Sequence, residues 1–443
     1  MEILSQIAEG MQGVLTDASD IIGIQTGFIK RERKFSGSGF IQTLVFGWLS
    51  NPESTLEELC QTAVALGIDI SPQGLNKRFT PQAADFLGKV LESAVSIVIA
   101  SEPVAIPILQ RFNGVCIQDG STIALPDELA TIWAGCGGSS PKNTSSSVKI
   151  QIRLDLNTGK LTGPYLQSGR ENDRSSQLKK IPLLPGALRI ADLGFFALGE
   201  FREMSANNVY WLTRIKSNSG LYYEGKRWSL LNLLEKHCNE EGDELDIQVE
   251  LGLKERLSCR LLAIRVSDDE ARLRRCKLIS EAKDKGAPVS ERVLKMASWR
   301  VLGCNISRDM LSFCEAFVLE RTRWQIELIF KLWKSYGCID EWRTQNPWRI
   351  ICEVYAKLVA MVIQHWILLA GCWEYPDRSL FKAVKTIRKH MVNIACSFAS
   401  GCLDRLYEAL KMIQRCLSIG CRINKRREKP HTYQLLLAIG DSS

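Results

Sequence analysis

The sequence lacks the residue patterns that hold structural metal ions or disulfide frameworks. It contains only 4 His, and although it contains 15 Cys, no two of these are spaced as Cys-x-x-Cys. Structural zinc needs clustered Cys and His ligands, so we expect no zinc site. Glu2 and Glu9 stand where a signal peptide would be basic, and no long apolar core follows. We therefore expect no disulfide framework, and cysteines that are mostly buried small apolar residues.

Long apolar runs without charge are also missing. The longest apolar stretch, from about Val354 to Cys372, contains Lys357, Gln364 and His365. This composition predicts a buried helix rather than a membrane span, so no membrane partner is expected. There is no internal repeat and no low-complexity segment. The content of 45% hydrophobic and 24% charged residues is that of an ordinary folded protein with room for two to four structural units.

Basic residues are scarce relative to acidic ones only at the N-terminal end. The net charge of +8 divides into −4 for residues 1–100, +5 for residues 101–370 and +7 for residues 371–443. The last part includes a basic run at residues 421–429, and a smaller basic cluster occupies residues 31–34. A basic balance of this size is compatible with a nucleic acid partner but does not by itself indicate one.

Residues 1–100 have a helical pattern. A helix start is indicated between Asn51 and Leu66, where Ser54 precedes Glu57 by three residues. A turn-rich break at residues 67–74 follows, and the helical pattern resumes over residues 75–100 with an interruption near Thr80. Helix, short turn and helix is the outline of a helix-turn-helix motif and equally of a plain helical hairpin, and the pattern leaves both open.

From residue 112 the hydrophobic period becomes that of strands. We expect strands at residues 115–125, 147–156, 161–167, 188–194 and 209–216, a turn at 157–159 and a helix at 196–206. Two further strands, at 245–251 and 257–266, fall in a mixed segment at 218–300, and the chain after residue 312 is mainly helical. Three antiparallel strands followed by a crossover and a strand–helix–strand unit is the element order of a ribonuclease-H-like fold of the mixed α/β (α+β) class.

The segment from Arg323 to Lys334 combines charge with helical periodicity. As a helix it places Arg323, Glu327, Lys331 and Lys334 on one face, with apolar residues on the others. Taken alone, this stripe is most simply a solvated face with ion pairs between successive turns.

Two strand aspartates add to this stripe. Asp119 lies inside an apolar strand and Asp192 at the end of another, and each is close to a glycine. Each could separately be a cap or turn residue, but a carboxylate on a core strand is costly unless it is paired or binds a metal ion. Phosphodiester cleavage requires two Mg²⁺ or Mn²⁺ ions about 3.5–4 Å apart, held by hard oxygen ligands. Asp119, Asp192 and Glu327 are candidates for such ligands.

These residues resemble the DDE transposases of bacterial insertion sequences, in particular the class with a Tyr-Arg-Glu-Lys signature. Arg323, Glu327 and Lys334 match the spacing of that signature, whereas Glu320 occupies the Tyr position. The segments Asp119-Gly-Ser-Thr and Ala191-Asp-Leu-Gly resemble the two Asp motifs of the family. The resemblance covers about residues 25–370 and includes the segments 28–35 and 71–79 near the N-terminus.

The resemblance implies roles for these and other residues. It implies that Asp119, Asp192 and Glu327 are catalytic and bind two Mg²⁺ or Mn²⁺ ions. It also implies DNA contacts, which fall on the following residues: Arg323, Lys331, Lys334, Arg214, Lys216 and Trp299. The family equivalent of Trp299 receives a flipped base in some members, and the alternative for Trp299 is a buried tryptophan in a strand.

The implied activity is cut-and-paste transposition. The chain would cleave double-stranded DNA at the ends of the element and join the freed 3′-hydroxyl to target DNA, acting as a homodimer on paired ends. The location would be the bacterial cytoplasm, with the nucleoid when DNA is bound. Two alternatives stay open: a metal-dependent nuclease without strand transfer, and an inactive derivative that only binds DNA.

The same resemblance predicts a domain organisation. We expect a helical DNA-binding region at residues 1–105, the first part of the ribonuclease-H-like core at 106–217, and a β-rich insertion at 218–305. The last part of the core, with the Glu helix, would occupy 306–345, and a C-terminal helical region would occupy 346–443.

Glu320 is the main departure from the family. A carboxylate repels a phosphate unless a neighbour such as Arg323 neutralises it. We therefore expect Glu320 to weaken the binding of end DNA, and Glu320→Tyr to strengthen it. Alternatively, Glu320 is a solvated residue at a helix N-terminus.

Overall fold

The computed structural model describes residues 2–31, 35–137, 144–284, 286, 288–424 and 431–440. It divides into two compact units. The first consists of Met1–Ala105, Asp119–Lys180 and Gln325–Tyr433, and the second of Ile106–Gln118, Ile181–Trp324 and Gln434–Ser443. The basic run at 421–429 and the basic cluster at 31–34 lie largely outside the described residues.

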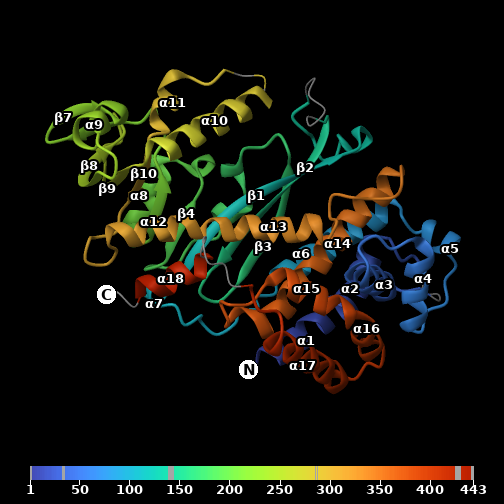
Figure 1. Cartoon of the computed structure of the whole chain (residues 1–443). Coiled ribbons are helices and arrows are strands. Elements are labelled where there is room, and N and C mark those ends of the chain that lie inside the picture. Colours follow the sequence, from blue (N-terminus) through green and yellow to red (C-terminus); the bar gives the residue numbers. More distant parts are fainter. Residues whose placement is uncertain are drawn as a thin grey trace. The chain divides into compact units, whose positions relative to one another are not determined.

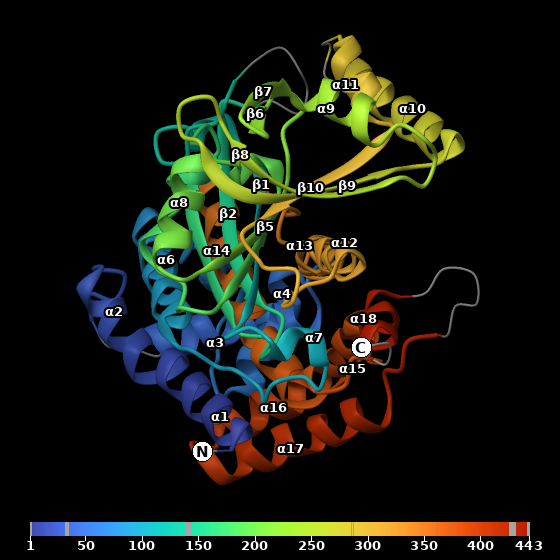
Figure 2. The same cartoon turned by 90° about the vertical axis from the view of Figure 1, so that its left-hand side faces the viewer.

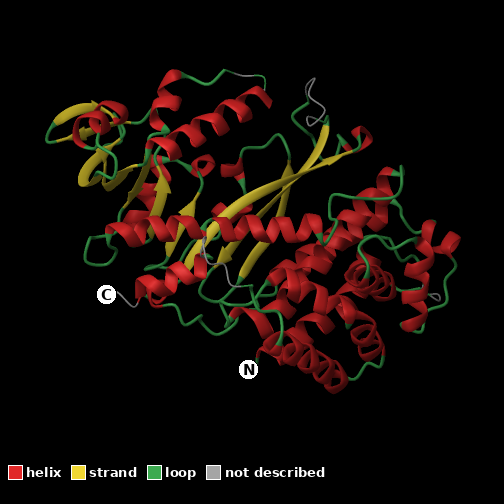
Figure 3. Ribbon diagram, in the orientation of Figure 1, coloured by secondary structure: helices red, strands yellow, loops and turns green. Residues whose placement is uncertain are grey.

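The N-terminal segment is helical, as its pattern predicts (Figures 1 and 3). The helices are α1 (Ile3–Gly13), α2 (Ser19–Gln25), α3 (Gly37–Ser50), α4 (Leu56–Ala65), α5 (Pro72–Asn76), α6 (Pro81–Ser96) and α7 (Pro107–Gln110), with a π-helical turn at Val14–Ala18. The start of α4 is one residue later than expected, because Thr55 and Glu58, and not Ser54 and Glu57, form the reciprocal capping box. The interruption near Thr80 is the N-cap of α6.

The strands lie close to their expected positions. They are β1 (Val115–Leu125), β2 (Ser146–Asp155), β3 (Leu161–Ser168), β4 (Leu188–Ala191), β5 (Tyr210–Arg214), β6 (Gly220–Tyr223), β7 (Lys226–Ser229), β8 (Glu244–Leu251), β9 (Leu257–Arg265) and β10 (Trp299–Cys304). In the described chain they form one sheet in the order β3-β2-β1-β4-β5-β10-β9-β8-β6-β7.

The sheet order identifies the fold. Strands β2 and β3 pair antiparallel, whereas β1 with β4 and β4 with β5 pair parallel. The order β3-β2-β1-β4-β5, with helix α8 (Leu198–Ala206) between β4 and β5, is that of a ribonuclease-H-like core. The expected fold class is therefore confirmed.

Strands β6 to β10 extend the sheet beyond this core. They pack with α9 (Leu230–His237) around an apolar cluster that includes Trp211, Leu261 and Trp299. Helices α10 (Asp268–Asp284) and α11 (Glu291–Met296) connect β9 to β10 and lie beside each other in both views (Figures 1 and 2).

The remaining helices come after β10. They are α12 (Phe313–Thr322), α13 (Trp324–Ser335), α14 (Pro347–Leu368), α15 (Leu380–Lys389), α16 (Met391–Ala399), α17 (Leu403–Ile419) and α18 (Thr432–Gly440). Helix α14 and the π-helical turn after it, at Leu369–Trp373, are long and apolar enough to cross a membrane, but the apolar window is entirely buried in the protein. The expected buried helix is therefore confirmed.

The cysteines are all unpaired, as expected, but fewer are buried than expected. Seven of the 15 are buried, five are exposed and three are intermediate. Burial raises the pKa of Cys259 to about 12 and of Cys304 to about 11, so these thiols stay protonated and pack as small apolar groups.

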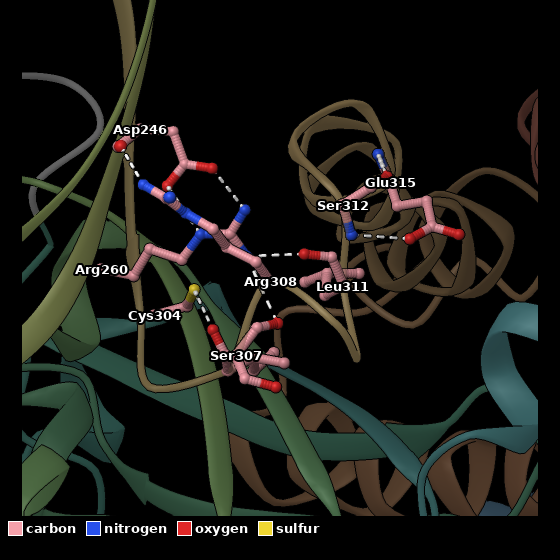
Figure 4. Close-up of polar contacts among 9 residues, drawn as sticks. Asp246, Arg260, Cys304, Ser307, Arg308, Leu311, Ser312 and Glu315 are labelled. Carbon is pink, nitrogen blue, oxygen red and sulfur yellow. Dashed lines mark hydrogen bonds and ion pairs between the residues drawn. The ribbon is translucent and has the colours of Figure 1, made fainter.

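A buried ion pair fixes the segment that leads into α12 (Figure 4). Arg260, on β9 and 2% exposed, donates two hydrogen bonds to Asp246 of β8, at 2.8 and 2.6 Å. Its Nη1 also donates to the carbonyl oxygen of Leu311 at 2.6 Å. Ser312 then caps α12 in a reciprocal box with Glu315. The start of α12 is thus attached to the β8–β9 hairpin.

Candidate active site

The two candidate aspartates follow a shared position in the sheet. The last paired residues of the parallel strands β1 and β4 are Gln118 and Ala191, and Asp119 and Asp192 come directly after them. The paired register of these strands ends at Gln118 and Ala191, and Asp192 lies one residue beyond the end of β4. Asp119 belongs to the first unit and Asp192 to the second.

Asp119 has a fixed carboxylate. Its Oδ1 accepts a hydrogen bond from the backbone N–H of Gly120 at 2.8 Å. A Cβ atom at Gly120 would lie 2.7 Å from the Gln151 amide nitrogen of β2, so a larger residue there would require the Gln151 side chain to move. Gln151 is fully buried, and its amide donates to Asp173 at 3.0 Å. The sequence alone did not indicate Gln151, because its position beside Gly120 depends on how the strands pair.

Asp192 lies where β4 ends and a short 3₁₀ turn, Leu193–Phe195, begins. Its side chain is 44% exposed, and its Oδ1 lies 4.0 Å from Nε of Arg323. Arg323 connects α12 to α13. The structure therefore brings together two of the expected site residues, Asp192 and Arg323, within the second unit.

Glu327 lies in the first turn of α13, in the first unit, and is half-buried. The other end of α13 is held at β1, where Nζ of Lys334 donates to the carbonyl oxygen of Thr122 at 3.0 Å. Lys334 also pairs with Asp340 at 3.6 Å. The contact between Lys334 and Thr122 lies seven residues after Glu327, about 10 Å along the helix. It lies three residues after Asp119, also about 10 Å along the strand.

The expected one-helix arrangement is only partly correct. Glu320 belongs to α12 and not to the helix of Glu327, and it is 5% exposed. Its carboxylate accepts from Nε of Arg214 at 2.7 Å and pairs with Arg300 at 3.7 Å. Glu320 is therefore not a solvated helix start, and the arginines that contact its carboxylate are Arg214 and Arg300 rather than Arg323. Its expected effect on DNA binding stays a prediction.

The remaining candidate DNA contacts differ in accessibility. Lys331 is exposed on α13, and Lys216 is half-buried with its ammonium over the ring of Phe196. Trp299 is 6% exposed, donates to the carbonyl oxygen of Cys238 at 2.6 Å and packs in the apolar cluster of the second unit. The structure therefore favours the alternative for Trp299, a buried tryptophan in a strand.

The complete set of three acids is not contained in either unit. Within the part of the chain that the structure describes, no group of three or more His, Cys, Asp or Glu side chains is close enough to hold a metal ion. Asp119 and Glu327 belong to the first unit and Asp192 to the second.

Comparisons with known proteins identify the family of this chain. Residues 110–363 match the family model described as the transposase DDE domain. The transposase of insertion sequence element IS231C from Bacillus thuringiensis subsp. berliner is 28% identical over 444 residues, which cover 93% of this chain and 89% of that protein. The transposase of IS231B from the same subspecies is 29% identical, over 76% of this chain and 74% of that protein. The transposase of IS1151 from Clostridium perfringens is 25% identical, over 78% and 76%.

A solved structure also aligns with most of the chain. It is a piggyBac transposase synaptic complex with hairpin DNA, and the alignment covers 97% of this chain and 87% of that one, with a TM-score of 0.48 and 11% identity. The fold assignment rests on the strand order of the core, and the family assignment on the match over residues 110–363. The chain belongs to the transposase DDE domain family and is a DNA transposase of the bacterial insertion-sequence type.

Proposed function

We propose that this transposase cleaves DNA at the ends of its element and transfers the freed strand to target DNA, with Asp119, Asp192 and Glu327 as its catalytic metal ligands. The observation that carries this proposal is the β1–β4 register, in which Gln118 pairs with Ala191 and an aspartate follows each of them. If the two carboxylates meet there, they repel each other unless a cation lies between them.

The donor set fits divalent metal ions, which DDE transposases use. All three groups are carboxylates, the hard oxygen ligands that Mg²⁺ and Mn²⁺ prefer. The hydrogen bond from Gly120 fixes the orientation of the Asp119 carboxylate, as ligand-orienting contacts do in metal sites. We propose two ions in each site; when bound, they activate the attacking oxygen and stabilise the leaving oxygen.

The basic residues around these acids have separate tasks in this proposal. Lys331 and Arg214 are exposed and are available to DNA phosphates. Arg323, only 12% exposed and 4.0 Å from Asp192, is placed to orient that carboxylate. Lys334 holds the end of α13 against Thr122. These positions are those of the Arg-Glu-Lys part of the Tyr-Arg-Glu-Lys signature, and we propose that the chain belongs to this class.

We further propose that the chain works as a homodimer on paired DNA ends, without a membrane partner, in the bacterial cytoplasm. The helices of residues 1–105 would take part in recognising the ends. In this arrangement the five segments expected from the sequence, with boundaries at residues 105, 217, 305 and 345, describe functional regions of the chain.

The test is a strand-transfer assay. Purified protein is incubated with Mg²⁺ or Mn²⁺, a duplex that carries the element's own end, and a supercoiled target plasmid. We expect end cleavage followed by covalent joining of the 3′ end to the plasmid. Cleavage without joining would assign the chain to metal-dependent nucleases, and end binding without cleavage would make it an inactive DNA-binding derivative.

A further inference from the structure

Two arginines lie as diagonal neighbours on one face of the sheet in the second unit. Arg214 of β5 pairs directly with Leu302 of β10, and Arg300 precedes Leu302 by two residues. Residues two apart on a strand point to the same face, and diagonal partners across an antiparallel pair lie about 7–8 Å apart. Both side chains are partly open to solvent, with 49% of Arg214 and 39% of Arg300 exposed.

The buried carboxylate of Glu320 contacts both arginines. Its side chain is 6% exposed, and one carboxylate oxygen binds Nε of Arg214 at 2.7 Å while the other lies 3.7 Å from Arg300. The guanidinium of Arg300 also lies over the ring of Phe317, 5.0 Å from its centroid, one turn before Glu320 on α12. The carboxylate and the ring thereby fix the direction of two long, otherwise mobile side chains.

Positive charge at this place exceeds the charge of Glu320. Arg274 of α10 donates to the carbonyl oxygen of Trp299 at 2.9 Å, next to Arg300 in the chain. Burial lowers the pKa of Arg274, and the charges of Arg300 and Arg214 lower it further, while Glu270 and Glu320 act in the opposite direction. Glu270 is exposed on α10, so Glu320 is the buried carboxylate that faces the arginines.

We propose that Arg214 and Arg300 form a paired guanidinium site for a phosphodiester of DNA, and that Glu320 is its positioning residue. The inference rests on the proposed function, because it assigns the site to DNA bound by the transposase. A guanidinium held on one edge by a carboxylate presents its remaining N–H groups outward, in the geometry that a phosphate accepts. Glu320 therefore strengthens DNA binding through the arginines, although its own charge repels DNA.

The test measures DNA affinity of the full chain by fluorescence anisotropy over a range of salt concentrations. The variant is Arg300→Gln, and the control is Arg272→Gln, which removes the same charge from a side chain that is 73% exposed on α10. We expect Arg300→Gln to lower affinity and to reduce the salt slope by about 1, as the loss of one phosphate contact does. Equal affinity and equal slope in the two variants would overturn the site.

The role of Glu320 is tested by Glu320→Gln, with thermal unfolding as a check of folding. If the carboxylate positions the arginines, the variant binds DNA at least about 10-fold more weakly despite its added positive charge. In an Arg214→Gln/Arg300→Gln background, the same substitution then has no further effect. Tighter binding by Glu320→Gln would mean that the carboxylate only repels DNA and would overturn the positioning role. If Glu320→Gln does not fold, Glu320→Asp replaces it, with a smaller loss expected for the shortened contact.

Three ligands separate the sources of phosphate: a duplex of the element's end, a random duplex of equal length, and inorganic phosphate. We expect Arg300→Gln to affect both duplexes alike, because a backbone phosphate carries no sequence. An effect on inorganic phosphate alone would overturn the assignment to DNA. Cleavage is measured separately: wild-type protein without cleavage contradicts the proposed function, whereas unchanged DNA affinity in Arg300→Gln contradicts only this inference.

Discussion

Asp119 and Asp192 stand out because carboxylates are unusual in apolar strands. Glu327 stands out because its spacing from Arg323 and Lys334 matches the family signature. Arg300 could not be found in this way, because its relation to Arg214 depends on the pairing of strands that are about 90 residues apart. Glu320 stands out in the sequence only as a departure from the family signature, and its contacts with Arg214 and Arg300 become visible only in the structure.

His365 gives a residue-scale prediction about pH. It is 2% exposed, and its Nε2 donates to the carbonyl oxygen of Gly159 at 2.7 Å. Burial lowers its pKa from 6.5 to about 4. The unfolded chain thus binds a proton between pH 6.5 and 4 that the folded chain does not, so stability falls as pH falls through this window. The loss amounts to about 3 kcal/mol at pH 4.

Urea unfolding of the full chain at several pH values measures this effect. The difference in unfolding free energy between pH 7 and pH 4 should be about 3 kcal/mol smaller in His365→Gln than in the wild type. It should stay unchanged in His237→Gln, because His237 is exposed. If His365→Gln kept the wild-type pH dependence, the buried neutral imidazole would not be its source.

Among the elements, the strands agree with their sequence patterns better than the helix boundaries do. The expected strand at residues 115–125 coincides with β1 (Val115–Leu125), and the alternating segment at 147–156 differs from β2 by one residue at each end. The break between α12 and α13 at Arg323 was not predicted, because the helical pattern continues across it. That break separates Glu320 from Glu327, so the residues at the signature positions lie on two different helices.

The loop after α13 depends on Lys357 of α14. This lysine is 2% exposed, and its Nζ donates to the carbonyl oxygens of Cys338 at 2.9 Å and Glu341 at 2.7 Å. It also lies 3.9 Å from the buried carboxylate of Glu353. Lys357→Met should lower the unfolding free energy by about 3–5 kcal/mol, the usual cost of removing one partner of a buried ion pair.

The matched control is Lys411→Met, which removes an exposed lysine paired with Glu408 in the same unit and should cost at most about 1 kcal/mol. Urea unfolding compares the two variants. Equal, small losses would show that the loop does not depend on Lys357. Burial lowers the pKa of Lys357, so the comparison is made at neutral pH, where the wild-type contacts are best maintained.

At the scale of the whole molecule, compact units do not follow the order of the chain. Residues 1–105 share a unit with residues 325–433, and within it α3 and α6 pack against the buried helix α14. The sequence pattern gives element types but not these contacts, because they join segments about 270 to 310 residues apart. Deleting residues 1–100 would expose α14, so end recognition is better tested by point variants.

Lys77 offers such a variant. It is exposed at the end of α5, in the segment 71–79 that resembles the N-terminal region of the family. If this region recognises the ends, Lys77→Gln should reduce the preference for end DNA over random DNA in competition gel shifts. Lys89→Gln, on α6 with a side chain 46% exposed, removes the same charge and should leave the preference unchanged. Equal behaviour of the two variants would argue against recognition by α5.

The most direct test of the account is metal-dependent cleavage of end DNA by Asp119→Asn, Asp192→Asn and Glu327→Gln. The controls are Glu128→Gln and Glu203→Gln, exposed acids close in sequence to the two aspartates. Mutating a residue that only orients a metal ligand typically lowers metal affinity or activity by about 10–100-fold. Loss of a ligand itself should therefore reduce cleavage by more than about 100-fold. The account predicts this loss in all three variants, with folding and DNA binding retained and both controls active. Near-normal Mg²⁺-dependent cleavage by any one of the three would contradict it.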